Sequence, residues 1–550
     1  MAKGYRPVNR DQLFLLPPSM RDWLPPGHPV WLVIRVVEEH LDTSAFRARR
    51  KTGGAGAAGY DPEMLVTVLV WAYAHQVTSS RRIEELCGTD VAFRVICGGN
   101  LPDHATIARF RADFGDPVAA FFAGVLALCA RLGMGRLGVV ALDGTKIAAS
   151  ASKSANRTEG TLGKLAAETV ARHGETDAAE DDLFGAGVRG DEVPGDAWSP
   201  RRRDERIAAA LAGLAAERAA AERAGQAKAA EFRARRAAGL PTGAVPLAAA
   251  VEVARQKLDR AVAAQQAKID DWQARDAAAR AGTGQGLDSG TRPKSPAGEY
   301  VRVREAAAGL DRARQRVAAA RARKQDRAGP GAVRNITDPD SRLMPVRGGG
   351  FIQGYNAQNV TSADGLILAT RLTQDTGDVT WFEPMTAAAG QAAALIAAHH
   401  RGPARPGGAE PGGDRDGGHP IGLILADAGY LSEANLTCPG PDRLIAAGKR
   451  RDLENAARGG TAGGKAAGQA VTAMAARLRT EAGITAYRQR GHIAETPHGY
   501  IKHSMAFRQL SMRGKRKTAA EWTFTCAISN LFKAITTGHL TSQALTALAR

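Results

Sequence analysis

Two aspartates each follow a run of apolar residues and lie just before a glycine. Asp143 follows VVAL and precedes Gly144, while Asp427 follows LILA and lies two positions before Gly429. Asp-Gly is a common turn dipeptide, so a β-turn accounts for Asp143 on its own, and a local side-chain turn accounts for Asp427. Because the same pattern occurs twice, we favour two buried strands that each end on a functional carboxylate.

Continuous Val, Ile and Leu runs are typical of strands covered on both faces of an α/β sheet, and functional groups in such sheets lie at the carboxyl ends of the strands. If the two strands are neighbours, Asp143 and Asp427 lie about 5 Å apart. Two carboxylates this close repel each other unless a cation neutralises them. Mg²⁺ or Mn²⁺, which prefer oxygen ligands, are the expected cations.

A third carboxylate would allow two metal ions about 3.5–4 Å apart, the arrangement used for in-line phosphodiester chemistry. Glu495 is the best candidate, because it is an acidic residue in the basic segment 484–507. It lies seven residues before Lys502, on what we expect to be one helical face. Pro497 restricts that helix, which places Glu495 in its first turn or just before it. The alternative is that Glu495 is a solvated helix charge.

The N-terminal part of the chain, up to about residue 125, is predicted to be helical. The segments 61–76, 79–88 and 103–115 each begin with a capping residue and continue with apolar residues at helical spacing. In the last of these we expect Ile107 and Phe110 to face inward and Arg109 and Arg111 to face outward. Short helices with outward arginines form either a helix-turn-helix unit that binds DNA or an ordinary bundle with solvated arginines.

The remaining chain contains a helical stretch and then a region of strands. Residues 200–328 are rich in Ala, Arg and Glu and predict three long helices with a thin core, 204–239, 251–282 and 303–324. Residues 349–374 predict a β-hairpin around 362–365, residues 380–400 an amphipathic helix, and residues 442–450 a short parallel strand.

Composition limits the possible partners and locations. The 550-residue chain has a formal net charge of +18, which favours a polyanion such as DNA as partner. No apolar stretch reaches the ~20 residues that span a bilayer, so we expect no membrane. The N-terminus lacks the apolar region of a secretory signal. The five scattered cysteines indicate a reducing, cytoplasmic setting and neither a zinc site nor a disulfide framework.

Several segments together resemble a known family. The residues Tyr487, Arg490, Glu495 and Lys502 resemble the Tyr-Arg-Glu-Lys signature of bacterial insertion-sequence DDE transposases. ALDGTKI and LILADAGY resemble the first- and second-aspartate segments of that family. Residues 4–31, TIARFRADF and GYNAQNV also resemble it, so the similarity covers most of the chain.

This resemblance implies an α/β fold, with an RNase H-like catalytic core made of a mixed sheet flanked by helices. It places an all-α N-terminal domain for DNA binding at 1–130, the split core at 131–200 and 340–540, and a helical insertion at 201–339. Asp143, Asp427 and Glu495 become the catalytic and metal-binding triad, with two bound Mg²⁺ or Mn²⁺ ions. Tyr487, Arg490 and Lys502 become contacts to DNA, in addition to Arg109 and Arg111.

The implied activity is cleavage at transposon ends and strand transfer into target DNA. The expected partners are double-stranded DNA, comprising terminal inverted repeats and a target, and a second copy of the chain in a synaptic dimer. The expected location is cytoplasmic and nucleoid-associated. Two alternatives stay open: a metal-dependent DNA nuclease of the same fold that joins no strands, and an architectural DNA-binding protein whose carboxylates are structural.

Overall fold

The computed structural model describes residues 7–11, 19–48, 58–115, 117–168, 200–240, 242–283, 296–328, 333–346, 349–400, 419–448, 461–462, 465–466 and 468–548. The chain forms two compact units. The first, which we call the sheet unit, comprises Met1–Ala155 and Thr337–Arg550, and the second, the helical unit, comprises Asn156–Ile336. The helical unit begins before the predicted insertion 201–339 and ends three residues before its predicted end. The N-terminal helices belong to the sheet unit and do not form a compact unit of their own.

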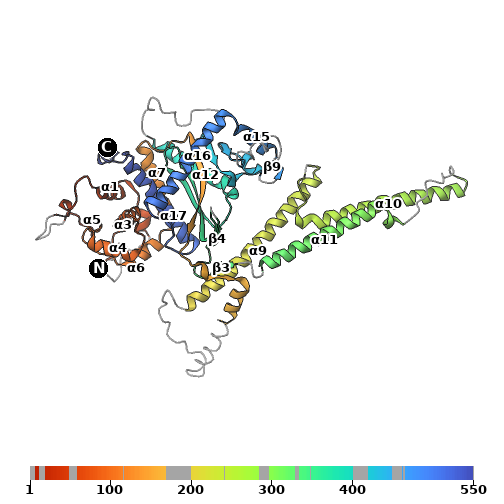
Figure 1. Ribbon diagram of the computed structural model, residues 1–550, viewed down its shortest axis with the longest axis horizontal. Coiled ribbons are helices and arrows are strands. Elements are labelled where there is room, and N and C mark those ends of the chain that lie inside the picture. The colour runs from red at the N-terminus through yellow and green to blue at the C-terminus, as the bar shows by residue number, and fades with distance from the viewer. Residues whose placement is uncertain are drawn as a thin grey trace, which may run out of the picture. The chain divides into compact units, whose positions relative to one another are not determined.

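A mixed sheet lies at the centre of the sheet unit (Figure 1). Its strands run in the order β4 (Arg342–Pro345), β5 (Phe351–Ser362), β1 (Val139–Ala148), β7 (Leu423–Ala426) and β8 (Asp442–Ile445), and β6 (Ile367–Thr373) also pairs with β5. β5 is antiparallel to β1, β4 and β6, whereas β7 and β8 are parallel to β1 and to each other. Two further short strands, β9 (Thr461–Ala462) and β10 (Lys465–Ala466), pair with each other.

The predicted strands are confirmed, with one correction. β5 and β6 form the expected hairpin, and β8 is the expected short parallel strand. β1 does not end at Asp143 but continues to Ala148. Asp and Gly are poor strand formers, so the sequence suggested a turn there. The ladder with β5, which pairs Asp143 with Asn359 and continues to Ala148 opposite Gly354, outweighs that local preference.

Helices surround this sheet. In chain order they are η1 (Met20–Asp22), α1 (Pro29–Arg35), the π-turn η2 (Val36–His40), α2 (Ser44–Arg47), α3 (Pro62–Ala74), α4 (Ser80–Thr89), α5 (Val91–Cys97), α6 (His104–Ala112), α7 (Pro117–Arg131), η3 (Lys153–Ala155), η6 (Val379–Trp381), α12 (Phe382–His399), η7 (Ala428–Tyr430), α13 (Glu433–Thr437), α15 (Gln469–Arg477), α16 (Glu481–Gly499), the π-turn η8 (Tyr500–Ser504), α17 (Lys515–Thr536) and α18 (Ser542–Leu548). Side-chain caps at Asp61, Ser79 and Asp103 begin α3, α4 and α6, as the sequence predicted.

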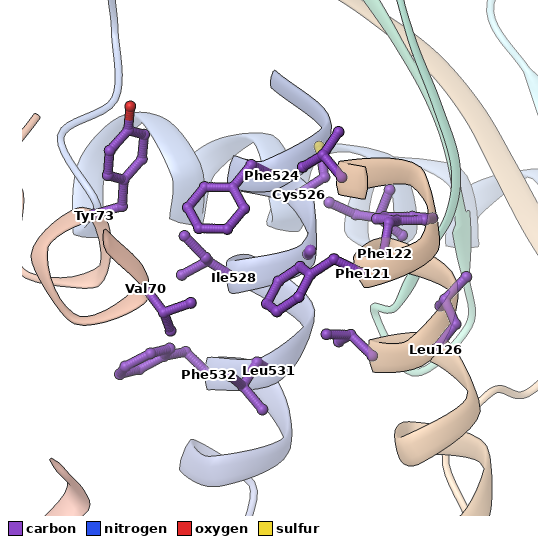
Figure 2. Close-up of a cluster of buried hydrophobic side chains, with 14 of the residues drawn as sticks. Val70, Tyr73, Phe121, Phe122, Leu126, Phe524, Cys526, Ile528, Leu531 and Phe532 are labelled. Carbon is purple, nitrogen blue, oxygen red and sulfur yellow. The ribbon is translucent and has the colours of Figure 1, made fainter. Parts of the chain in front are cut away.

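Helix α17 joins the N-terminal helices and the sheet into one core. It packs against α3, α7 and β6, and Figure 2 shows Phe524, Ile528 and Leu531 of α17 between Val70 of α3 and Phe121 of α7. All these side chains are essentially buried. This shared core explains why residues 1–130 do not form a unit separate from the sheet.

The expectation that Arg111 faces outward is wrong. Only 7% of Arg111 is exposed. Its guanidinium donates to the Tyr73 hydroxyl at 3.2 Å and to Ser80 Oγ at 3.1 Å, and it also contacts the carbonyl of Thr78. Ile107 and Arg111 are four residues apart, so they lie on the same face of α6, and the burial of Ile107 carries Arg111 inward. Arg109 is two residues from Ile107 and from Arg111, so it points away from that face and is exposed as expected.

The helical unit has the thin core that its composition predicts. It contains α9 (Pro200–Ala237), η4 (Leu247–Ala249), α10 (Ala250–Arg280), η5 (Ala297–Glu299) and α11 (Val301–Ala328), and α11 lies alongside α10 (Figure 1). Its buried apolar side chains form two small clusters, around Leu162 and Ile207 and around Phe232 and Ala249. The strands β2 (Asn156–Thr158) and β3 (Val333–Asn335) pair antiparallel where the chain enters and leaves this unit.

Among the described residues, no single helix is long and apolar enough to cross a membrane. The pair α6 and α7 passes that test together by length and composition only, and its two helices meet at 82°.

Candidate active site

Asp143 and Asp427 lie next to each other at the end of β7. The parallel register pairs Leu142 of β1 with Ala426 of β7, so each aspartate is the residue after this last pair. β7 ends there, while β1 continues along β5. Asp143 is therefore paired with β5 on one side and has no partner in β7 on the other. The prediction that the two strands are neighbours in the sheet is confirmed.

The two aspartates differ in their surroundings. The Asp143 side chain is 16% exposed and the Asp427 side chain 37% exposed. Asp427 precedes η7, and its Oδ1 accepts a hydrogen bond from the Gly429 amide at 2.8 Å. Its Oδ2 faces Arg490 at 3.8 Å. The two oxygens of Asp427 thus have different neighbours.

Arg490 of α16 connects the two carboxylates. Its Nη2 lies 2.9 Å from Asp143 Oδ1 and 3.8 Å from Asp427 Oδ2. The Arg490 side chain is 14% exposed, and its Nε has no hydrogen-bond partner in the described part of the chain. A single guanidinium therefore balances part of the negative charge of both aspartates.

The environment favours the neutral form of Asp143. Burial raises the pKa of this carboxyl to about 6, although the charge of Arg490 opposes the rise, and the nearby charge of Asp427 adds to it. A carboxyl group that is kept partly neutral by burial and like charge is characteristic of functional sites.

The other predicted members of the basic segment also face this site. Tyr487 donates from its hydroxyl to the carbonyl of Ala426 at 3.1 Å, at the end of β7. Lys502, in η8, donates to the Thr145 hydroxyl and to the carbonyl of Lys146. Burial lowers the pKa of Lys502, while the charge of Asp143 opposes this. Both side chains are half-buried.

Glu495 is placed differently from our expectation. α16 begins at Glu481 behind the Thr480 cap and continues through Pro497, so Glu495 lies near the end of the helix and not in its first turn. The helix tolerates the proline because Ile493, Ala494 and Pro497 are buried, and this packing outweighs the lost hydrogen bond. Glu495 is exposed, and its charge acts on Arg490.

Among the described residues, no three His, Cys, Asp or Glu side chains lie close enough together to hold a metal ion. The structure therefore brings Asp143 and Asp427 together, and it leaves Glu495 apart from them.

Asp378 is a carboxylate at this site that sequence reasoning missed. It lies between β6 and η6, and its Oδ1 accepts hydrogen bonds from Asn356 Nδ2 at 2.7 Å and Gln358 Nε2 at 2.6 Å. The ammonium of Lys146 lies 3.6 Å from the same oxygen. The charge of Asp378 is one of those that raise the pKa of Asp143. The sequence offered only a weak indication of an additional polar site. Asn356 and Gln358 are two residues apart, which places two amides on the same face of a strand.

His498 is a second side chain that we did not expect at the site. It is 7% exposed, and its ring lies next to the backbone of Asp143. Burial, together with the charge of Lys502, lowers the pKa of His498 to about 4. His498 is therefore a neutral imidazole at pH 7.

The geometry defines a carboxylate site with cationic side chains at the carboxyl end of a parallel strand pair in a mixed α/β sheet. Two family models match separate parts of the chain. The Transposase domain (DUF772) matches residues 18–113, and the Transposase DDE domain matches residues 458–535. Both matches support an insertion-sequence DDE transposase, and they do not confirm the branch with the Tyr-Arg-Glu-Lys signature. No curated protein and no solved structure matches the chain significantly.

The second match has a direct relation to the site. Its range contains α16 and η8, and therefore Tyr487, Arg490, Glu495 and Lys502. Asp143, Asp427 and Asp378 lie outside both matched ranges. The structure connects these parts, because Arg490 from the matched segment contacts both aspartates.

Proposed function

We propose that the protein cleaves DNA at the ends of an insertion sequence and joins the cleaved strands to target DNA, with a divalent cation bound by its carboxylates. One observation carries this proposal. Asp143 and Asp427 lie side by side at the end of β7, and Arg490 from the segment that matches the Transposase DDE domain contacts both. In this arrangement the two aspartates offer oxygen ligands to a metal ion, and the Arg490 guanidinium offers a positive charge to a DNA phosphate.

We propose an RNase H-like core for the sheet unit. The order β6-β5-β1-β7-β8 supports this assignment. β6, β5 and β1 form an antiparallel meander, and β7 and β8 follow as parallel strands on the other side of β1. The carboxylates then lie where functional groups gather in α/β folds, at the carboxyl ends of parallel strands.

The residues at the site suit Mg²⁺ or Mn²⁺ by their chemistry. The available ligands are carboxylate oxygens, which hard divalent cations prefer, and the fully buried Asn356 adds an Oδ1 that has no hydrogen-bond partner in the described part of the chain. Asp143 and Asp427 would hold the cation. A cation held there would supply activation of the attacking water or 3′-hydroxyl and charge stabilisation for the leaving oxygen.

We retain Glu495 as the third acidic residue of the proposal. It lies on the same helix as Arg490, and its charge already acts on that arginine. Its side chain is exposed and makes no hydrogen bond or ion pair that would hold it away from DNA or metal among the described contacts. Its removal should therefore affect cleavage and leave folding unchanged.

In this proposal the cationic side chains around the carboxylates contact the DNA. Arg490 and Lys502 are positioned to receive a backbone phosphate beside Asp143, and Tyr487 borders them. Arg109 is exposed on α6, within the segment that matches the other transposase domain, and would contact DNA outside the catalytic site. Arg111 is excluded from this role by its buried contacts. The net charge of +18 favours binding to DNA.

Two transposon ends must be brought together, so a synaptic dimer on DNA belongs to this proposal, as does a cytoplasmic location at the nucleoid. The test uses purified protein, Mg²⁺ and a DNA fragment that carries the inverted repeats flanking the gene. The wild type should nick the ends and join them to a target plasmid. Asp143→Ala, Asp427→Ala and Glu495→Ala should each lower the cleavage rate by at least about a hundredfold, the scale of losing one electrostatic catalytic group, and still bind the ends.

The same assay separates the alternatives. Cleavage without joined products, even with ends that are already cut, would identify a nuclease. DNA binding that is unchanged by chelation of metal, with no cleavage at all, would identify an architectural protein.

A further inference from the structure

Asp427 lies between two other carboxylates and presents a different oxygen to each. Its Oδ2 faces the Arg490 guanidinium that also contacts Asp143. Its Oδ1 lies on the other side, next to Gly429. A side chain at Gly429 would place its first carbon 3.0 Å from Asp427 Oδ1 and 3.1 Å from Asp378 Oδ2. Asp427 Oδ1 and Asp378 Oδ2 therefore flank the same small space, which the absence of a side chain at Gly429 keeps open.

Asp378 is held in this position through its other oxygen. The amides of Asn356 and Gln358 both donate to Oδ1. These two residues pair with Lys146 and Gly144 of β1. A side chain at Gly144 would collide with Asp378 Oδ1 at 2.7 Å and with Gln358 Nε2 at 2.6 Å, so Gly144 allows the carboxylate to approach the sheet. With Oδ1 fixed, Oδ2 is the oxygen available to a ligand.

A buried acceptor without a donor lies beside this carboxylate. Asn356 is fully buried, and its Oδ1 has no hydrogen-bond partner in the described part of the chain. Its orientation is fixed, because only Nδ2 can donate to Asp378. The orphan Oδ1 lies 3.2 Å from the position that a Gly144 side chain would occupy, close to Asp378 Oδ1. A buried carbonyl oxygen next to carboxylates requires a hydrogen-bond donor or a hydrated cation.

The cationic side chains at this group lie on other oxygens. Arg490 contacts Asp143 Oδ1 and Asp427 Oδ2, and Lys146 lies 3.6 Å from Asp378 Oδ1. The oxygens that flank the space at Gly429 are Asp427 Oδ1 and Asp378 Oδ2, and two carboxylate oxygens are suitable ligands for a divalent cation.

We infer that Asp378 supplies Oδ2 to a second divalent-cation position that it shares with Asp427, with Asn356 as the neighbouring polar group. This inference rests on the proposed function and deepens it. Asp427 would then serve both cation positions, one with Asp143 and one with Asp378. The third carboxylate would then come from the loop between β6 and η6, a segment far in sequence from Glu495.

The test is a titration of the full chain with Mn²⁺ in the absence of DNA. The EPR signal of free Mn²⁺ measures how much of the ion is bound. Asp378→Asn keeps the size of the side chain and removes its charge. We expect this variant to bind one of the Mn²⁺ ions with an affinity at least about tenfold lower, as removal of a group at a metal site does. The matched control is Asp375→Asn in the same loop, where the exposed carboxylate accepts only from Trp381 Nε1 at 2.8 Å among the described contacts. This control should bind as the wild type does.

Unchanged Mn²⁺ binding by folded Asp378→Asn would overturn the inference. If that variant does not fold, Gly144→Ala replaces it, because the added methyl group displaces Asp378 and leaves every carboxylate in the chain. Its control is Gly138→Ala, where the added carbon has no neighbour within 4 Å. Equal Mn²⁺ affinity in these two glycine variants also overturns the inference.

Cleavage and joining by the wild type are measured separately. Wild-type protein that binds Mn²⁺ through Asp378 but neither cleaves nor joins DNA would refute the proposed function and leave the cation position in place. If the wild type cleaves DNA and the Asp378→Asn variant binds Mn²⁺ with unchanged affinity, the inference is refuted and the proposed function stands.

Discussion

Asp143 is a carboxylate that destabilises the fold in its charged form. Burial raises its pKa to about 6 from an ordinary value of 3.8. The folded state therefore holds the proton more tightly than the unfolded state, so the free energy of unfolding falls as pH rises from about 4 through 6 and is constant above that. The loss corresponds to about 3 kcal/mol at pH 8 in the absence of metal.

Asp143→Asn should remove this dependence, because an amide does not ionise. We expect the variant to match the wild type near pH 4 and to be more stable by up to about 3 kcal/mol at pH 8. Urea unfolding in the presence of a chelator at both pH values measures the difference. A variant that is less stable at pH 8 would show that the ion pair with Arg490 is the main role of Asp143. Added Mg²⁺ should stabilise the wild type more than the variant.

The aspartate pair and Asp378 illustrate what a sequence reveals about a site. Asp143 and Asp427 were predictable because each follows its own apolar strand, and the repeated pattern implied adjacent strands. Asp378 follows no such run, and its position depends on the pairing of β5 with β1, which sets Asn356 and Gln358 opposite Lys146 and Gly144. This pairing joins residues about two hundred positions apart, and no local pattern specifies it.

At the scale of elements, a buried carboxylate connects α17, α3 and the segment after η8. Glu521 is fully buried and accepts from the Tyr73 hydroxyl at 2.8 Å and from the amides of Ser511 and Met512 at 2.9 and 3.1 Å. The Ser511 hydroxyl also donates to it. Arg111 reaches the same network through Tyr73.

Glu521→Ala should be strongly destabilising, because it leaves several buried donors without an acceptor. Each such group costs about 1–3 kcal/mol, so we expect a loss of roughly 3 kcal/mol or more in the free energy of unfolding. The control is Glu84→Ala on α4, whose exposed carboxylate pairs with His104 and should contribute less than about 1 kcal/mol. Urea unfolding of both variants checks this. Similar losses in the two variants would contradict a structural role for the Glu521 network.

Helix boundaries were predictable where local signals agree with packing, and wrong where packing prevails. The caps at Asp61, Ser79 and Asp103 fixed three starts correctly. Pro497 suggested a helix start, but the buried face of α16 carries the helix through it. Arg111 suggested a solvent-facing side chain, but its register with Ile107 and its hydrogen bonds place it inside. Charge and proline are local signals, and both were outweighed by contacts between distant segments.

For the whole molecule, the two units have separate cores. The large apolar cluster of the sheet unit and the smaller one behind α16 contain no described residue from 156–336. The clusters of the helical unit contain residues from 156–336 only. The chain passes between the units through β2 and β3, where Asn156 pairs with Asn335 and Thr158 with Val333.

This connection makes the helical unit removable. Replacement of residues 159–332 by Asn-Gly would close β2 and β3 into a two-residue hairpin, for which Asn-Gly is the preferred turn. Because the removed residues contribute nothing to the larger cores, the shortened chain should fold, with a melting temperature within about 5 °C of the main wild-type transition, a shift that corresponds to roughly 4 kcal/mol at about 2.1 cal/mol/K per residue. Calorimetry measures the transition, and Mn²⁺ titration of the same sample reports whether Asp143, Asp427 and Asp378 keep their arrangement. A shortened chain that remains unfolded would show that the helical unit is required to assemble the sheet, and a folded chain that has lost Mn²⁺ binding would show that it supports the carboxylate site.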